Sequence, residues 1–244
     1  PAPTLTVAPA VRYPVGDPES ATSTTSPVAD GLAPTTTPSP PTLPALDASD
    51  APLLAAATPL FGARGLPGIL VPDSIIERLV VTIDNLDRAP IRQRFRPVET
   101  VPGRPEASSA DTEDAVRYLP ASNTERYTPY VRVLEALEPA QVADLYRRYY
   151  PLVQQAYRNM GYPDAYFNDR LIDIIDHLLA TPRVTYPLAV VQPKVFYEFA
   201  DPQLEARSWG QKALIRLGPE HMATVKNFLR TLRASLVSTV DEPG

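Results

Sequence analysis

The stretch FNDRLIDIIDHLLATP, Phe167 to Pro182, carries the helical pattern around which the rest of this chain can be organised. At 100° per residue its apolar side chains fall on one half of a helix, and they are Leu171, Ile172, Ile174, Ile175, Leu178 and Leu179. Its polar side chains share the other half, and they are Asp169, Arg170, Asp173, Asp176 and His177. The pattern predicts a helix with one half in a core and an acidic half whose purpose is open.

Three interpretations of this acidic face compete. It could be a solvated face with local pairs from Asp173 to Arg170 and to His177, because side chains three and four residues apart are neighbours. It could be a structural face whose carboxylates bind Arg or Tyr from another helix. It could be a metal or acid/base site, although the spacing matches neither H-E-x-x-H nor an EF-hand loop. We treat the five polar residues as a candidate functional face and predict no metal site.

The N-terminal part of the chain differs in composition from the rest. Eleven of the 30 prolines lie in residues 1–44, where Thr, Ser and Ala make up most of the remainder. So little apolar content cannot offset the entropy of ordering. We therefore predict a disordered Pro-rich linker over residues 1–43, one α-helical domain over residues 44–238 and a frayed tail over residues 239–244.

Charge and cysteine content exclude several classes of function. The net charge of −5 argues against nucleic-acid binding, which normally needs a strong positive field. The chain has no Cys, so disulfides, thiolate metal ligands and Cys nucleophiles are excluded together. No 18-residue apolar stretch is visible in the sequence, so it predicts no membrane span. We expect no cofactor and no nucleic-acid partner.

Helical periodicity recurs through most of the chain after Pro44. Caps, prolines and glycines predict helices over residues 49–61, 72–86, 128–137, 139–161, 167–179, 202–217 and 219–236. Pro151 either kinks one long helix over residues 139–161 or separates two helices there. RFRPVETV (94–101) and DAVRYL (114–119) show rough alternation and are predicted to pair as a small hairpin. Residues 185–199 contain Pro193, which makes them at best an edge strand or an extended crossover. The predicted fold class is mostly α, a single multi-helix domain with a small irregular or β-hairpin insertion.

Other candidate binding residues lie outside the acidic face. The run Arg88, Arg92, Arg94 and Arg96 could meet an acidic partner or an anionic glycan. The tyrosines Tyr146, Tyr149 and Tyr150 follow helical spacing, so they are either core residues or a stacking platform for a sugar or peptide. Lys194, Tyr197 and Glu198 lie on an irregular, Pro-bounded connection, where binding residues are common.

Several runs resemble one bacterial family. LYRRYYPLVQQAYRNMGYPD before the opening stretch and VQPKVFYEFADPQLEARSWGQKALIRLGPEHMATVKNFLRTLR after it resemble the family called domain of unknown function 3014. VPDSIIERLVVTIDNLDR and RYTPYVRVLEAL resemble the same family, so the resemblance covers roughly residues 43–236. It implies an N-terminal inner-membrane anchor outside this sequence, a Pro-rich spacer and a periplasmic location. It implies no activity, substrate or catalytic residue.

The combined expectation is a non-catalytic interaction or assembly protein of the bacterial cell envelope, with a protein or a cell-wall component as its partner. The Pro-rich linker and the lack of a nucleophile–base, phosphate or metal motif favour it. The alternative is an enzyme acting on cell-wall glycan or peptide, with Asp173 or Glu198 as acid or base. A glycan-binding module that uses the acidic face and the tyrosines is a further possibility.

Overall fold

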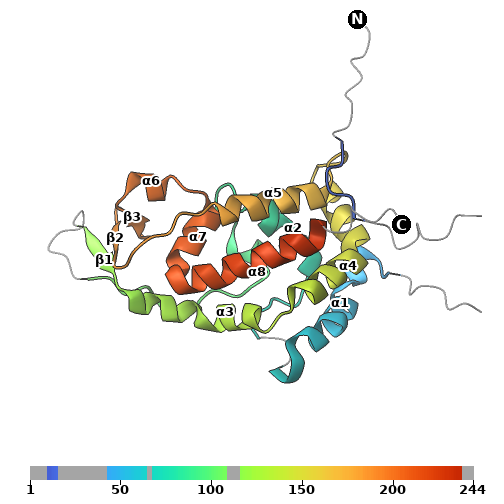
Figure 1. The fold of residues 1–244 in the computed structure, drawn as a ribbon, viewed down its shortest axis with the longest axis horizontal. Coiled ribbons are helices and arrows are strands. Elements are labelled where there is room, and N and C mark those ends of the chain that lie inside the picture. The colour runs from blue at the N-terminus through green and yellow to red at the C-terminus, as the bar shows by residue number, and fades with distance from the viewer. Residues whose placement is uncertain (1–9, 16–42, 65–67, 109–115, 238–244) are drawn as a thin grey trace, which may run out of the picture.

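A computed structural model describes residues 10–15, 43–64, 68–108 and 116–237 (Figure 1). Its helices are α1 Asp50–Ala57, α2 Ile75–Asn85, α3 Thr128–Glu135, α4 Pro139–Asn159, α5 Phe167–Leu179, α6 Pro202–Glu205, α7 Trp209–Leu217 and α8 Pro219–Val237. Its strands are β1 Arg117–Leu119, β2 Leu188–Val191 and β3 Glu198–Phe199. The prediction of a mostly α fold is confirmed. Among these described residues, no helix is long and apolar enough to span a membrane.

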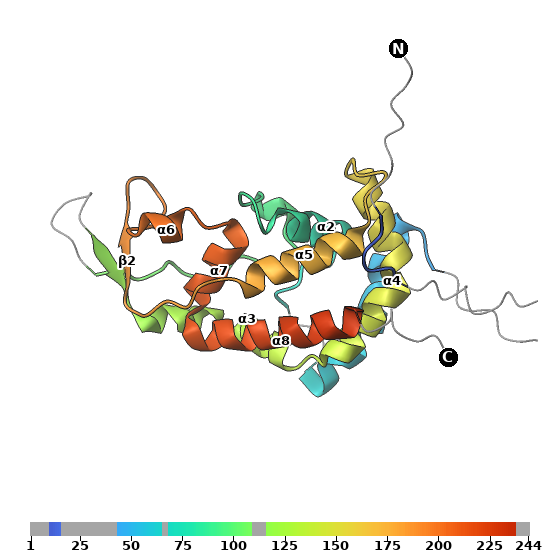
Figure 2. The ribbon, with the colours of Figure 1, turned by 45° about the horizontal axis from the view of Figure 1, so that its top comes forward.

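Helices α5 and α8 lie at the centre of the helical part. Helix α8 runs beside α3, α4, α5 and α7, and α2 packs against α4 and α5 (Figures 1 and 2). The predicted apolar half of α5 is in the core, where Ile172, Ile174 and Ile175 are at most 2% exposed. A fully buried side chain of this size contributes about 1.5–3 kcal/mol. This burial fixes which half of α5 remains available for polar contacts.

Helix α4 continues through Pro151, one of the two outcomes that the sequence left open. Proline in a helix interior removes a hydrogen bond and costs about 3 kcal/mol. Tyr149 and Leu152 are buried on either side of Pro151, and both belong to one hydrophobic cluster. Packing on both sides therefore holds the helix continuous across the proline.

The residues predicted as one helix over 202–217 form two helices instead. Asp201 caps α6 by accepting from Gln203 N at 2.8 Å, and the Ser208 hydroxyl caps α7. The break allows Gly210 N to donate to the Leu86 carbonyl at 2.8 Å, just beyond the end of α2. A Cβ at position 210 would lie 2.8 Å from that carbonyl oxygen, so the contact requires glycine. A tertiary contact thus overrides the local helical pattern.

The predicted hairpin between residues 94–101 and 114–119 is wrong. Val98 forms an isolated bridge with Leu70, and β1 pairs antiparallel with β2 in the register Leu119↔Leu188. Strand β2 is the central strand, because β3 pairs with its other edge. The expectation of at best an edge strand in residues 185–199 is therefore wrong for β2, whereas β3 is an edge strand. Pro193 lies between these two strands and interrupts neither of them.

One face of this small sheet determines the pairing. Leu119, Leu188, Val190 and Phe199 are at most 5% exposed and pack around Ile215 of α7. Alternation in a sequence shows that a segment has one buried face, but it does not name the partner strand. Packing against α7 selects the pairing of strands that are far apart in the sequence.

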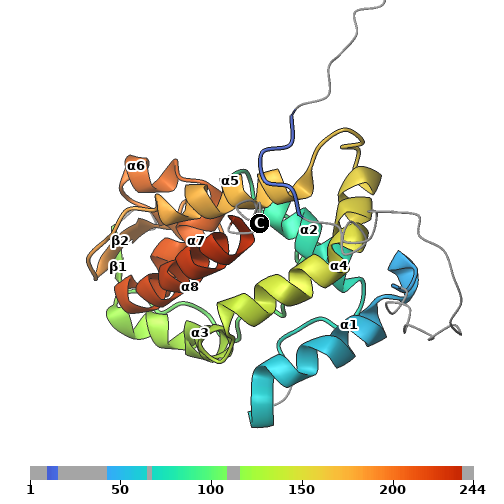
Figure 3. The same ribbon diagram turned by 45° about the vertical axis from the view of Figure 1, so that its right-hand side comes forward.

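A short part of the predicted linker has a defined place in the structure. Residues Ala10–Val15 lie along the beginning of α5, close to the C-terminal end of α8 (Figure 3). This differs from the expectation of a disordered linker throughout residues 1–43. The remaining parts of that linker up to residue 42, and the predicted tail, lie outside the described residues.

Candidate functional site

The polar half of α5 binds four different parts of the chain. Asp169 and Asp173 meet the N-terminal segment, and Arg170 meets α2. Asp176 meets α8, and His177 meets the residue that caps α7. The partner of Asp173 is thus not a neighbour within α5. Of the three interpretations of the acidic face, the geometry matches structural partnering with residues distant in sequence.

The beginning of α5 is positioned by a buried glutamine from α4. Gln154 Oε1 accepts from Phe167 N at 2.8 Å, and Gln154 Nε2 donates to the Ala165 carbonyl at 2.8 Å. The same Oε1 accepts from the Tyr150 hydroxyl at 2.8 Å. A side chain of α4 thereby satisfies a free N–H group at the start of the helix. This fixes the first turn, which carries Asn168 and Asp169.

That first turn holds the backbone of the N-terminal segment. The two oxygens of Asp169 accept from Arg12 N at 2.9 Å and from Tyr13 N at 2.8 Å. Asn168 Nδ2 donates to the Tyr13 carbonyl at 2.9 Å, and the Tyr166 hydroxyl accepts from Val15 N at 2.6 Å. We call Tyr166, Asn168, Asp169 and Asp173 the α5 peptide site.

Side chains of the segment add charge and apolar contacts. The Arg12 guanidinium donates to Asp173 Oδ2 at 2.6 Å, and this hydrogen bond holds the pKa of Arg12 above its ordinary value. Tyr13 packs against the cluster that contains Ile172 and Leu236. The segment therefore places an arginine over the carboxylates and an aromatic ring over the core.

Arg170 lies at the centre of a second, buried arrangement. We call it the Asp84 cluster, and it consists of Asp84, Asp87, Arg88, Tyr162 and Arg170. Arg170 Nε donates to Asp84 Oδ1 at 2.9 Å, while its two terminal nitrogens donate to the Asp87 carboxylate at 2.8 and 2.7 Å. Arg88 and the Tyr162 hydroxyl donate to the other oxygen of Asp84, at 3.1 and 3.3 Å.

Burial and pairing have opposite effects on the charges of the Asp84 cluster. Asp84 is 1% exposed, so its carboxylate depends on these donors rather than on water. Burial lowers the pKa of Arg170, but its hydrogen bonds to Asp87 and Asp84 outweigh this and raise the pKa. The hydrogen bond from Arg170 holds the pKa of Asp87 below its ordinary value. The cluster therefore joins α2 to α5 as a charged, structural contact.

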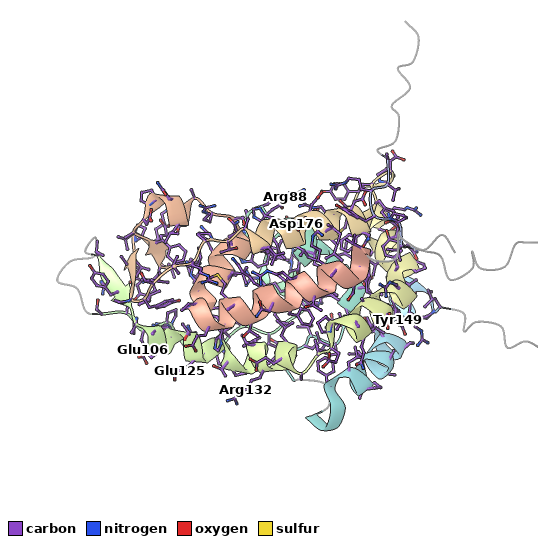
Figure 4. All side chains as sticks on the ribbon, viewed as in Figure 1. Arg88, Glu106, Glu125, Arg132, Tyr149 and Asp176 are labelled. Atoms are coloured by element: carbon purple, nitrogen blue, oxygen red, sulfur yellow. The ribbon has the colours of Figure 1, made fainter. Side chains whose placement is uncertain are left out.

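The remaining polar residues of α5 join it to α8 and α7. Arg233 donates to both oxygens of Asp176, at 2.6 and 2.9 Å (Figure 4 labels Asp176). Asp176 is the main cause that holds the pKa of Arg233 above its ordinary value, and the Tyr13 phenol adds to it. His177 Nε2 lies 2.8 Å from the Ser208 hydroxyl. Asp176 and His177 thus have structural partners as well.

The arginine run does not form one surface. Arg88 belongs to the Asp84 cluster, and Arg96 donates to the Ile91 carbonyl at 2.9 Å and lies over the Trp209 ring. Burial lowers the pKa of Arg96. Arg94 is exposed beside the Phe95 ring, and Arg92 is exposed. Only part of the run is therefore available to a partner in solution.

Tyr149 and Tyr150 are core residues, and Tyr146 is half-buried against the same cluster. Tyr149 and Tyr150 are 4% and 6% exposed, and the Tyr146 hydroxyl donates to Asn168 Oδ1 at 3.0 Å. Burial raises the pKa of Tyr146 and of Tyr150. Because a buried ring cannot stack on a sugar from solution, the structure does not support a stacking platform here.

The connection between β2 and β3 presents two apolar residues in addition to the residues that the sequence singled out. Lys194 and Glu198 are exposed, and Tyr197 is half-buried with its carbonyl accepting from Arg216 at 3.1 Å. Val195 and Phe196, which sequence reasoning missed, are 78% and 81% exposed. The sequence feature that could have identified them is a pair of apolar residues directly after Pro193 and Lys194.

A pocket of about 450 Å³ lies between the turn before α3 and the beginning of α8. Its polar lining includes Ser122, Glu125, Thr128, Tyr186 and His221 (Figure 4 labels Glu125). His221 Nε2 lies 3.1 Å from the Thr128 hydroxyl, and burial raises the pKa of Tyr186 to about 12. Sequence reasoning missed this pocket, because Thr128 and His221 are 93 residues apart.

Comparison with known families identifies the chain at the level of a family. The profile of the family described as "Protein of unknown function (DUF3014)" matches residues 75–233. The chain belongs to this family. The matched part of this DUF3014 protein contains the Asp84 cluster and all of α5, whereas the N-terminal segment lies outside it. No curated protein and no solved structure gave a significant match.

Proposed function

We propose that this DUF3014 protein is a non-catalytic interaction protein of the bacterial envelope, held in the periplasm by an N-terminal anchor. The observation that carries the proposal is an exposed apolar surface far from the N-terminal segment. We call Val116, Tyr118, Val195 and Phe196 the sheet end, and each is at least 48% exposed. Large exposed side chains that gather at one end of a protein are typical of interaction sites.

The arrangement of the two ends supports this function. The segment Ala10–Val15 meets the beginning of α5, whereas the sheet lies at the other end of the molecule (Figures 1 and 2). A chain tethered through its N-terminus would therefore present the sheet end away from its anchor. The partner that fits this end is a protein with a complementary apolar surface.

The polar candidate residues add a second line of support. Most are committed to contacts within the chain: the Asp84 cluster joins α2 to α5, and Arg233 joins α8 to Asp176. Asp173, a candidate acid or base, is bound to Arg12, while Glu198 lies exposed on β3. Side chains with such roles favour a scaffold over a catalytic centre.

Site-specific photocrosslinking at position 196 in intact cells tests the proposal. The expected result is a defined crosslinked protein in the periplasmic fraction, which is lost when Val195→Ser is combined with the probe. A probe at Phe95, which is 42% exposed near α2, is the matched control and is not expected to recover that protein. Recovery of the same neighbours from both positions, or of none from position 196, would overturn the proposal.

An enzymatic alternative rests on the pocket beside α8. An imidazole within reach of a hydroxyl is one element of nucleophilic catalysis, and Thr128 and His221 supply such a pair at 3.1 Å. Hydrolysis of a cell-wall peptide or glycan that disappears in His221→Ala, with an unchanged thermal midpoint, would favour this alternative. The absence of turnover by wild-type protein leaves the interaction function as the better explanation.

A further inference from the structure

We propose that the α5 peptide site binds peptide segments containing an arginine followed by an aromatic residue, and that the chain's own residues 10–15 occupy it. A partner segment of this chemistry would displace them. The inference goes beyond the proposed function, because it concerns the end of the molecule away from the sheet end. It stands whether or not the sheet end binds a protein.

The first argument is how completely the segment's backbone is bound. N–H groups of Arg12 and Tyr13 donate to Asp169, and that of Val15 donates to Tyr166. Position 14 is Pro, which has no N–H group to satisfy. All backbone donors from position 12 to position 15 therefore have an acceptor in the site.

The second argument is the alternation of side chains along the segment. Tyr13 and Val15 are half-buried, whereas Val11, Arg12 and Pro14 are exposed. The chain bends at Arg12 and Tyr13, and the side chains of Tyr13 and Val15 both meet the domain. They pack against two different hydrophobic clusters, one with Leu236 and one with Phe167.

The third argument is charge complementarity. Asp173 accepts from the Arg12 guanidinium at 2.6 Å, and Asp169 lies 3.8 Å from Arg12 Nε. Both side chains of the Arg12–Asp173 pair are about half exposed, at 52% and 48%. Exposed ion pairs contribute little to stability, but complementary charges select partners. The site therefore requires a cation directly before the aromatic residue.

The path of the chain explains why its own segment fills the site. Val15 and Leu43 pack against the same hydrophobic cluster, so the described residues on either side of positions 16–42 meet the same part of the domain. A covalently linked segment competes at a higher effective concentration than a free one. To replace the chain's own segment, a free partner segment must therefore make a further favourable contact outside the site, or be present at high local concentration.

The test uses full-length chains and a labelled peptide of residues 8–17, APAVRYPVGD. In the double variant Arg12→Ala, Tyr13→Ala the tethered segment is weakened, so the peptide is expected to bind saturably. Wild-type chain is expected to bind it about tenfold or more weakly, because the tethered copy competes. Adding Asp173→Asn to the double variant is expected to weaken peptide binding about two- to fivefold, as loss of an exposed ion pair does.

Controls separate recognition from general attraction. Asp144→Asn in the double variant is the matched change, because Asp144 is a 74% exposed aspartate on α4 outside the site. It is expected to leave the affinity unchanged, and a peptide with Arg and Tyr exchanged for Glu and Ala is expected not to bind. Equal binding to wild type and the double variant, or equal loss with both aspartate changes, would overturn the proposal. A wild-type dimer that the double variant lacks would overturn occupancy by the same chain.

Discussion

Helix α5 takes part in two carboxylate–arginine arrangements that differ in burial and in the distance between partners. In the Asp84 cluster, Asp84 is 1% exposed, and Arg170 reaches its carboxylate in α2 and that of Asp87 just beyond α2. In the α5 peptide site, Arg12 and Asp173 are both about half exposed. Removing one partner of a buried pair leaves an uncompensated charge, whereas an exposed partner returns to water. The first arrangement therefore stabilises the fold, and the second can open without unfolding it.

The largest effect is expected from Arg170→Ala. It leaves Asp84 without its main donor in the core, so we expect a loss of about 3–5 kcal/mol in unfolding free energy. For a chain of this size this lowers the thermal midpoint by roughly 6–20 °C. Arg230→Ala, an exposed arginine on α8, is the control and is expected to change the midpoint by less than about 2 °C. Similar small shifts for both variants would refute a structural role for the Asp84 cluster.

Unfolding free energies of wild type and Asp87→Asn over a pH series show how much the charge of Asp87 contributes to the same cluster, because Asn has nearly the same shape without the charge. The folded pKa of Asp87 is lowered, chiefly by Arg170, so the ionised group adds stability above its unfolded pKa of about 4. This contribution is lost as pH falls through the lower folded pKa. At pH 7 we expect Asp87→Asn to cost about 1.5–3 kcal/mol in urea unfolding. The difference from wild type is expected to shrink below about pH 4, and a pH-independent difference would contradict it.

Gly210→Ala tests how tightly the start of α7 packs against the chain just after α2, next to the Asp84 cluster. The added methyl group would lie 2.8 Å from the Leu86 carbonyl oxygen and 2.7 Å from Leu178 Cδ2. Backbone must move to admit it, at an expected cost of about 1–3 kcal/mol in unfolding free energy. Gly68→Ala, whose Cβ would meet nothing within 4 Å, is the matched control. Equal unfolding midpoints in urea for the two variants would show that the α2–α7 contact is loose.

The smallest effect on stability is expected from Asp173→Asn. The variant loses an exposed ion pair, so its thermal midpoint is expected to stay within about 2 °C of wild type. Hydrogen exchange at the amides of Arg12 and Tyr13 is nevertheless expected to become faster, because the segment opens more often. Amides within α5 are expected to keep their protection. Faster exchange throughout α5 would mean that the two arrangements are not independent.

Part of the fold and of the site could be predicted from local pattern. Apolar spacing correctly predicted α5 and its buried half, because a helix repeats every 3.6 residues whatever surrounds it. Helical spacing also indicated the core interpretation of Tyr149 and Tyr150. The sheet was mispredicted, since the partner of β1 is set by packing on α7 and not by alternation.

The sequence by itself determined that α5 has an acidic half, because the type and spacing of side chains are local properties. Only the tertiary structure decided what each acidic side chain binds. The partners of Asp169 and Asp173 lie 157 and 161 residues away, and that of Asp176 lies 57 residues away. Contacts over such separations depend on how whole helices pack, since no spacing within one segment encodes which distant residue will approach. The same helix face therefore carries both a buried structural cluster and an exposed peptide site.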